Sequence, residues 1–129
     1  MSLIKVGISY GELLDKLTIL EIKLAKIKDE EKLENIRYEY DLLRHTWERA
    51  GKDPARIEQL LARLKAVNEQ LWGIEDDIRM KEAASEFDAQ FIELARSVYV
   101  TNDERARLKK EINLALGSAL VEEKSYEEY

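Results

Sequence analysis

A line of polar side chains runs along the apolar side of a predicted helix between about residues 55 and 83. The line contains four residues: Asn68, Glu75, Arg79 and Glu82. Their spacings of 7, 4 and 3 residues keep them on one side of a helix, inside its apolar arc. Charged groups on a core-facing side are costly unless they are paired. The line therefore predicts an ion network, a ligand pocket or a groove for a partner.

Charged residues on two other predicted helices complement this line. Arg105 and Lys109 lie on the side of their helix that continues into an apolar stripe, and Glu21 falls within the apolar arc of the first helix. The candidate ligand-binding site thus comprises seven residues: Glu21, Asn68, Glu75, Arg79, Glu82, Arg105 and Lys109. Its carboxylates would hold a divalent cation, and its basic groups would hold an anionic small molecule such as a nucleotide.

The sequence lacks the residues that most kinds of catalysis need. The chain has no cysteine and one histidine, His45, which excludes thiolate metal sites, a cysteine nucleophile and reactions that use two imidazoles. No glycine-rich phosphate loop, nucleophile elbow or zinc-ligand spacing is present in the sequence. We therefore expect no catalytic residues, no metal ligands and no cofactor, with a divalent cation in the candidate site as the exception.

The charge balance and hydropathy bear on partners and location. The 21 basic and 27 acidic side chains give a net charge of −6, which argues against general binding to nucleic acid or to an anionic membrane. No apolar run approaches the ~20 residues of a membrane span, and no segment resembles a signal peptide. We expect a cytoplasmic protein.

Cap signals divide the first half of the chain. Ser9 and Glu12 form a capping box that begins a helix of residues 10–28. Asp29 has the character of a second N-cap, which predicts a break before a helix of residues 30–50. A single kinked helix across this point is the alternative.

The clearest signal for a turn between helices is the run from Gly51 to Pro54. Gly51 suits a helix C-cap, Asp53 suits an N-cap and Pro54 suits the first helical position. The helices on either side carry apolar residues at alternating spacings of three and four. We expect them to form a long antiparallel hairpin over about residues 30–83, with coiled-coil-like packing.

Two further helices are predicted after this hairpin. One covers about residues 85–100, and a capping box of Thr101 and Glu104 begins the other, which ends near Gly117. Residues 118–129 form an acidic tail. The predicted fold is all-α: a helical bundle in which the hairpin is packed by an N-terminal helix and two C-terminal helices.

The organisation is that of one helical domain over residues 1–129, which begins with an extended arm of residues 1–8. The first helix carries Ile19 and Ile22 on the side opposite its main leucine stripe. A helix that is apolar on two sides is either central in its bundle or covered by a second subunit. The second alternative makes a homodimer a serious candidate.

Four segments resemble an uncharacterised family of small helical proteins from bacteria and phages. They are residues 8–23, 71–79, 91–105 and 122–126. The resemblance covers nearly the whole chain, and it implies that the tail belongs to the domain. It supplies no activity and no catalytic residues.

These features favour a non-enzymatic helical protein that works by association with itself or with another protein. The apolar stripes, the two-sided first helix and the lack of a catalytic motif support this interpretation. The alternative is a small all-α enzyme or ligand binder that uses the seven-residue site. A solvent-filled cavity at that site would favour the alternative, and a closed, salt-bridged seam would favour association.

Overall fold

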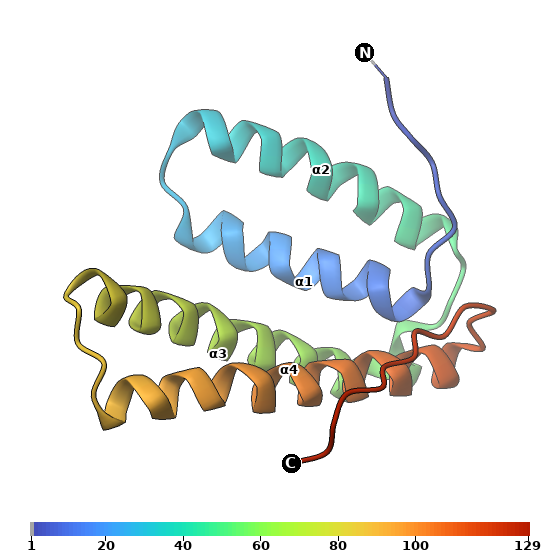
Figure 1. Cartoon of the computed structure of the whole chain (residues 1–129). Coiled ribbons are helices and arrows are strands. Elements are labelled where there is room, and N and C mark those ends of the chain that lie inside the picture. The colour runs from blue at the N-terminus through green and yellow to red at the C-terminus, as the bar shows by residue number, and fades with distance from the viewer. Residues whose placement is uncertain (1) are drawn as a thin grey trace.

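The computed structural model describes residues 2–129, and it is all-helical. Its four α-helices and one 3₁₀-helix are α1 Tyr10–Lys26, α2 Glu30–Arg49, η1 Pro54–Ile57, α3 Glu58–Ala83 and α4 Ala89–Leu116. No residue of this range belongs to a strand, and the arm and tail are irregular. The all-α bundle predicted from the sequence is confirmed. In Figure 1, α1 and α2 form one layer, and α3 and α4 form the other.

The break between α1 and α2 is a capped connection, as predicted. Asp29 accepts hydrogen bonds from the backbone N–H groups of Glu31 and Lys32, and extended backbone at Ile27 ends α1. At the other end of α1, the Ser9 hydroxyl accepts from the Glu12 N–H at 3.1 Å. The predicted break into two helices is therefore correct, and the alternative of a single kinked helix is not.

Helix α1 lies at the centre of the bundle, where it contacts α2, α3 and α4. One side packs Leu13, Leu17 and Leu20 into the apolar core. On the opposite side, Ile22 is only 3% exposed and Ile19 is half-buried. Of the two explanations for a helix that is apolar on two sides, the central position accounts for this burial within one chain.

The pairing of the helices differs from the predicted hairpin of residues 30–83. Helix α2 pairs with α1, and α3 pairs with α4, whereas α2 and α3 do not pair in the described part of the chain. Gly51, with φ of +68°, and Pro54 mark the turn as expected. However, η1 carries the chain from one layer to the other, and α1 occupies the position beside α3 that the prediction assigned to α2.

A single helix, α4, replaces the two predicted C-terminal helices. Its N-cap is Asp88, which accepts from the Phe91 N–H at 3.0 Å, and left-handed Gly117 ends it. Thr101 is buried in the middle of α4 and begins no helix. The prediction was wrong because Thr101 and Arg105 are polar members of one continuous series with spacings of three and four, from Val98 to Leu108.

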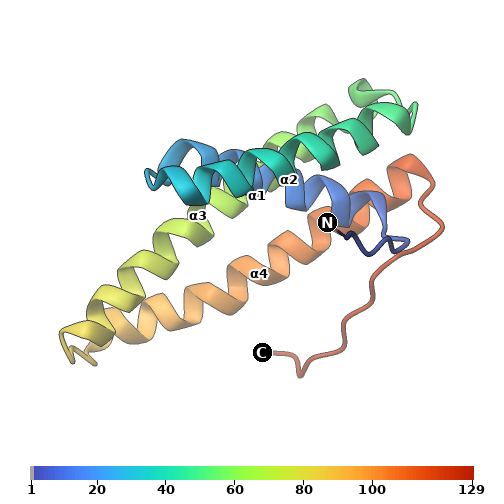
Figure 2. The same ribbon diagram turned by 90° about the horizontal axis from the view of Figure 1, so that it is seen from above.

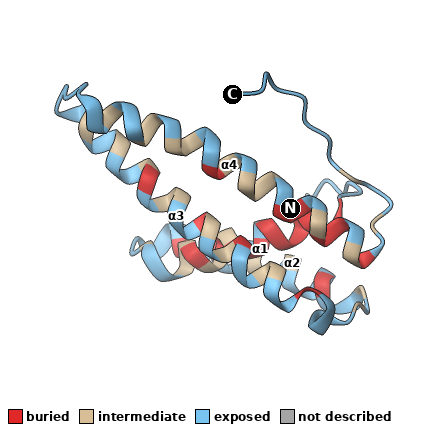
Figure 3. Ribbon diagram, turned by 90° about the horizontal axis from the view of Figure 1, so that it is seen from below, coloured by how far each residue is buried: buried red, intermediate tan, exposed pale blue. Residues whose placement is uncertain are grey.

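One end of the α3–α4 hairpin extends beyond the α1–α2 layer (Figure 2). We call residues 69–100 the projecting hairpin. Ile74 is its one buried residue, although several of its apolar side chains are half-buried between α3 and α4. Buried residues concentrate instead where the two layers meet (Figure 3). The core therefore lies at one end of the α3–α4 hairpin and leaves the other end without a covering helix.

Candidate functional site

A cluster of polar side chains lies where α1, α3 and α4 meet, and its centre is Asp15. This carboxylate is 1% exposed. The Arg105 guanidinium binds it at two points: Nε donates to Oδ1 at 2.9 Å, and a terminal nitrogen donates to Oδ2. Asn68 Nδ2 donates to the same Oδ1 at 2.9 Å. One buried acid on α1 thus ties together both helices of the other layer.

Further contacts extend this cluster on both sides. Asn68 also donates to the Thr18 hydroxyl at 2.9 Å. The Lys109 ammonium donates to Glu12 at 2.7 Å, and it lies 3.9 Å from Asp15. It also donates to Glu122 in the tail at 3.2 Å. We call these residues the Asp15 cluster: Glu12, Asp15, Thr18, Asn68, Arg105, Lys109 and Glu122.

The buried atoms of the Asp15 cluster are all paired, whereas the side chains of Glu12 and Glu122 at its edge are 31% and 51% exposed. Every buried side-chain nitrogen and oxygen in residues 2–129 has a hydrogen-bond partner. A buried charge pair with all its hydrogen bonds made costs little, whereas the loss of one partner is expensive. The cluster therefore acts as an internal ion network that fixes how the two layers cross.

The backbone contact between α1 and α4 is equally tight. The Gly11 N–H, which has no intrahelical partner at the start of α1, donates to Asn113 Oδ1 of α4 at 2.6 Å. A Cβ at Gly11 would meet the backbone carbonyl of Lys109 and lie 3.0 Å from that Asn113 oxygen. Glycine is thus required here for the close approach of the two helices.

The seven residues of the candidate site separate into three groups. Asn68, Arg105 and Lys109 come together in the Asp15 cluster. Glu21 lies apart from it and accepts from Lys65 at 2.9 Å. The remaining three are on the projecting hairpin: Glu75, Arg79 and Glu82. The structure therefore does not bring the seven residues into one site.

The sequence interpretation missed several members of the cluster, above all Asp15. A usable signal was present: Gly11, Asp15, Thr18 and Ile22 are spaced by four, three and four residues. This spacing makes one helical face of small, polar and apolar residues. Such a face fits against another helix when the polar groups find partners. Asn113 could not be assigned in the same way, because its partner is the backbone of a helix 102 residues away.

The positive charges of the cluster are stabilised by their surroundings. Burial disfavours the Lys109 ammonium, but the bond to Glu12 and the charge of Asp15 outweigh it and raise the pKa of Lys109. The hydrogen bond to Asp15 likewise raises the pKa of Arg105. The bond to Glu21 raises the pKa of Lys65.

This electrostatic arrangement predicts a loss of stability in alkali. A raised folded-state pKa for Lys109 means that its contribution is complete below the unfolded-state pKa, near 10.5, and is lost as pH rises through the higher folded-state value. We expect the difference in unfolding free energy between wild type and Lys109→Met to shrink above about pH 10.5. Urea titrations from pH 8 to 12 measure it, with exposed Lys110→Met as the control. A constant difference across this range would contradict the assignment.

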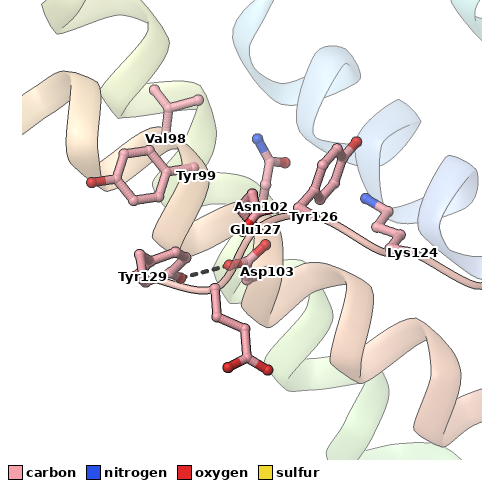
Figure 4. A pocket seen from close by; sticks show the side chains of 9 residues that line it. Val98, Tyr99, Asn102, Asp103, Lys124, Tyr126, Glu127 and Tyr129 are labelled. Atoms are coloured by element: carbon pink, nitrogen blue, oxygen red, sulfur yellow. Dashed lines mark hydrogen bonds between the residues drawn. The ribbon is translucent and has the colours of Figure 1, made fainter.

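A second feature is an open hollow between α4 and the tail, of about 1090 Å³. We call it the C-terminal hollow, and nine residues line it: Val98, Tyr99, Asn102, Asp103, Lys124, Tyr126, Glu127, Glu128 and Tyr129. The Tyr129 hydroxyl donates to Asp103 at 2.5 Å. Figure 4 shows Tyr99 and Tyr129 on one side of Asp103 and Tyr126 on the other. Sequence interpretation assigned no site here.

Two further observations concern metals and membranes. In the described residues, no group of three or more histidine, aspartate or glutamate side chains is arranged to hold a metal ion. Among the helices of residues 2–129, none is both long and apolar enough to cross a bilayer.

The fold and its buried ion network define a small all-α bundle protein. The chain belongs to a family of unknown function (DUF6165), whose family model matches residues 4–129. The resemblance to an uncharacterised family is therefore confirmed, and the match includes most of the arm and the whole tail. No curated protein and no solved structure matches the chain.

Proposed function

We propose that this protein is a non-enzymatic helical interaction protein that forms a homodimer through its projecting hairpin. One observation carries this proposal. The face of the α3–α4 hairpin on which α1 packs continues along the projecting hairpin, where no helix of the described chain covers it. Where α1 covers α3, polar residues of α3 are paired with α1. Beyond the point where α1 crosses α3, the hairpin projects without a helix packed on this face (Figure 2).

On α3, this face is marked by the polar line of the sequence. Asn68 is buried beneath α1, but Glu75 is half-buried, and Arg79 and Glu82 are exposed. Glu75 and Arg79 form an intrahelical ion pair of 3.1 Å. Trp72, which is half-buried, lies on the same side by helical spacing. We call Trp72, Glu75, Arg79 and Glu82 the α3 strip.

The neighbouring helix contributes apolar surface. Phe91, Ala95 and Val98 lie on the line of α4 that leads to Arg105, at spacings of four, three and seven residues. Phe91 is half-buried and stacks edge to face with exposed Phe87 at 5.2 Å. Aromatic side chains are enriched in the cores of protein interfaces, and they supply apolar area there that a two-helix hairpin cannot bury by itself.

The charges of the α3 strip favour a second copy of this chain as the partner. In an antiparallel pairing about residue 77, Glu75 of one copy faces Arg79 of the other, and the same contact repeats by symmetry. A two-fold interface is self-complementary in this way. The same pairing places Trp72 opposite Glu82, whose aliphatic stem would cover the ring.

The alternative of a small enzyme or ligand binder at the predicted seven-residue site has less support. Arg105 and Lys109, its strongest anion-binding groups, are already bonded to Asp15 and Glu12. Glu75 and Glu82 are on the projecting hairpin, away from them. His45 is exposed on α2 and belongs to neither group.

Reversal of one charge in the α3 strip is expected to separate the copies. Arg79→Glu would place glutamates opposite each other in both symmetric contacts, and like charges across an interface cost several kcal/mol. Light scattering after size exclusion should change from a dimer to a monomer of 15.1 kDa. Because Arg79 is exposed, the variant should remain folded as a monomer, with the helical circular dichroism of the wild type.

Helix α2 offers a matched control. Arg44 and Glu48 form an exposed ion pair with the same spacing, at 3.2 Å. Arg44→Glu should leave the dimer intact. The double swap Glu75→Arg with Arg79→Glu restores opposite charges and should restore the dimer. The proposal is rejected if the wild type is a monomer, or if the Arg79→Glu variant remains a dimer.

A further inference from the structure

The C-terminal hollow brings together aromatic rings and carboxylates from two segments that are far apart in the sequence. Tyr99 and Asp103 come from the middle of α4, whereas Lys124, Tyr126 and Tyr129 come from the tail. The rings of Tyr99 and Tyr129 lie 5.1 Å apart between centroids and are inclined by 72°. Two rings at nearly a right angle, with a third ring across the hollow, form walls around an open space (Figure 4).

The tail is fixed to α4 upstream of this hollow. Glu122 accepts from Lys109 at 3.2 Å, and Glu123 accepts from Lys110 at 3.0 Å. The bond from Tyr129 to Asp103 fixes its far end. These three contacts place the tail alongside α4 at both ends of the hollow.

We propose that the C-terminal hollow binds an organic ammonium ion, such as a polyamine or a quaternary amine, between its tyrosine rings and its carboxylates. Ring faces attract cations through their quadrupole, and aromatic walls are the recurring solution for organic ammonium groups. Asp103, Glu127 and Glu128 add negative charge. The aromatic rings and carboxylates of this site lie on α4 and the tail, outside the α3 strip.

The charges of the hollow distinguish a cation from an anion as its ligand. Three carboxylates line it against one ammonium, that of Lys124. A small anion would therefore meet a net negative surface, whereas an amine would replace or displace Lys124. A volume of about 1090 Å³ accommodates an extended polyamine.

The test is a calorimetric titration of the full chain with spermidine and, separately, with tetramethylammonium chloride. Both should bind saturably, and spermidine should bind more tightly because it carries more charge. Asp103→Asn and Tyr129→Leu should each weaken spermidine binding roughly 3- to 30-fold, the range expected for loss of one cation–π or charge contact. Lys124→Gln should strengthen it, because a competing cation is gone.

The tail and α4 positions allow controls that keep the fold. Tyr129 is 78% exposed, so its replacement should leave the melting temperature unchanged. Tyr38→Leu on α2 and Asp76→Asn on α3 remove the same side-chain types from other exposed sites, and they should not alter binding. The proposal is overturned by any of three results. These are no saturation up to about 10 mM spermidine, a spermidine affinity in Asp103→Asn and Tyr129→Leu equal to that of the wild type, or preferential binding of inorganic phosphate that requires Lys124.

Discussion

Asp15→Leu is expected to lower the free energy of unfolding by about 3 kcal/mol, among the largest effects of any single substitution in this chain. The change leaves the Arg105 guanidinium without its carboxylate and removes an acceptor from Asn68. Loss of one partner from a buried ion pair typically costs 3–5 kcal/mol. The lower end applies because the Arg105 side chain is 29% exposed and can recover some hydration. Urea unfolding followed by circular dichroism measures the change.

A double variant separates the ion pair from the fold that it supports. Asp15→Leu with Arg105→Met removes both charges and retains most of the volume, so much of the lost stability should return. Lys16→Leu, at the exposed neighbour of Asp15, is the matched single control and should change stability by less than about 0.5 kcal/mol. Equal destabilisation in the single and double variants would show that Arg105 is not stranded when Asp15 is lost.

Gly11→Ala should destabilise the protein by about 2–3 kcal/mol, although alanine is normally the better helix former. The added methyl group would collide with the backbone carbonyl of Lys109, which cannot rotate away as a side chain can. Relief requires α1 and α4 to separate, and separation weakens the bond from the Gly11 N–H to Asn113. Thermal melting and urea unfolding both report this change.

Gly73 provides the control for that substitution within the same chain. It lies in the interior of α3, and an added Cβ there would meet no atom within 4 Å. Gly73→Ala should therefore stabilise the protein by about 0.5–1 kcal/mol through helix propensity alone. If Gly11→Ala also stabilised the protein, the close approach of α1 to α4 would be wrong.

Local signals in the sequence predicted the helix ends well. Ser9, Asp29 and Gly117 each act within one turn of their own position, so the side chain and its backbone partner are both visible in the sequence. The same reasoning failed at Thr101. A capping box describes a possible start, but burial of Thr101 within a continuous stripe allows α4 to run through it.

The pairing of the helices was harder to predict from the sequence, because it depends on which helix faces compete for burial in the core. The stripes of α2 and α3 suit an antiparallel hairpin, yet α1 is buried on two sides and takes the central place. The same competition explains the polar line. Its first member, Asn68, donates to Asp15 and Thr18 of α1, whereas Arg79 and Glu82 are exposed on the projecting hairpin. Periodicity identifies a shared face, but it does not reveal how far a neighbouring helix covers it.

The most direct test of self-association through the α3 strip uses two variants that should fail to pair with themselves. Arg79→Glu carries two glutamates at positions 75 and 79, and Glu75→Arg carries two arginines there. Each variant alone should sediment as a monomer of 15.1 kDa. Their equimolar mixture should form a heterodimer, because every glutamate then faces an arginine across the two-fold contact. A mixture that remains monomeric, with wild type dimeric under the same conditions, would contradict the antiparallel contact between α3 strips.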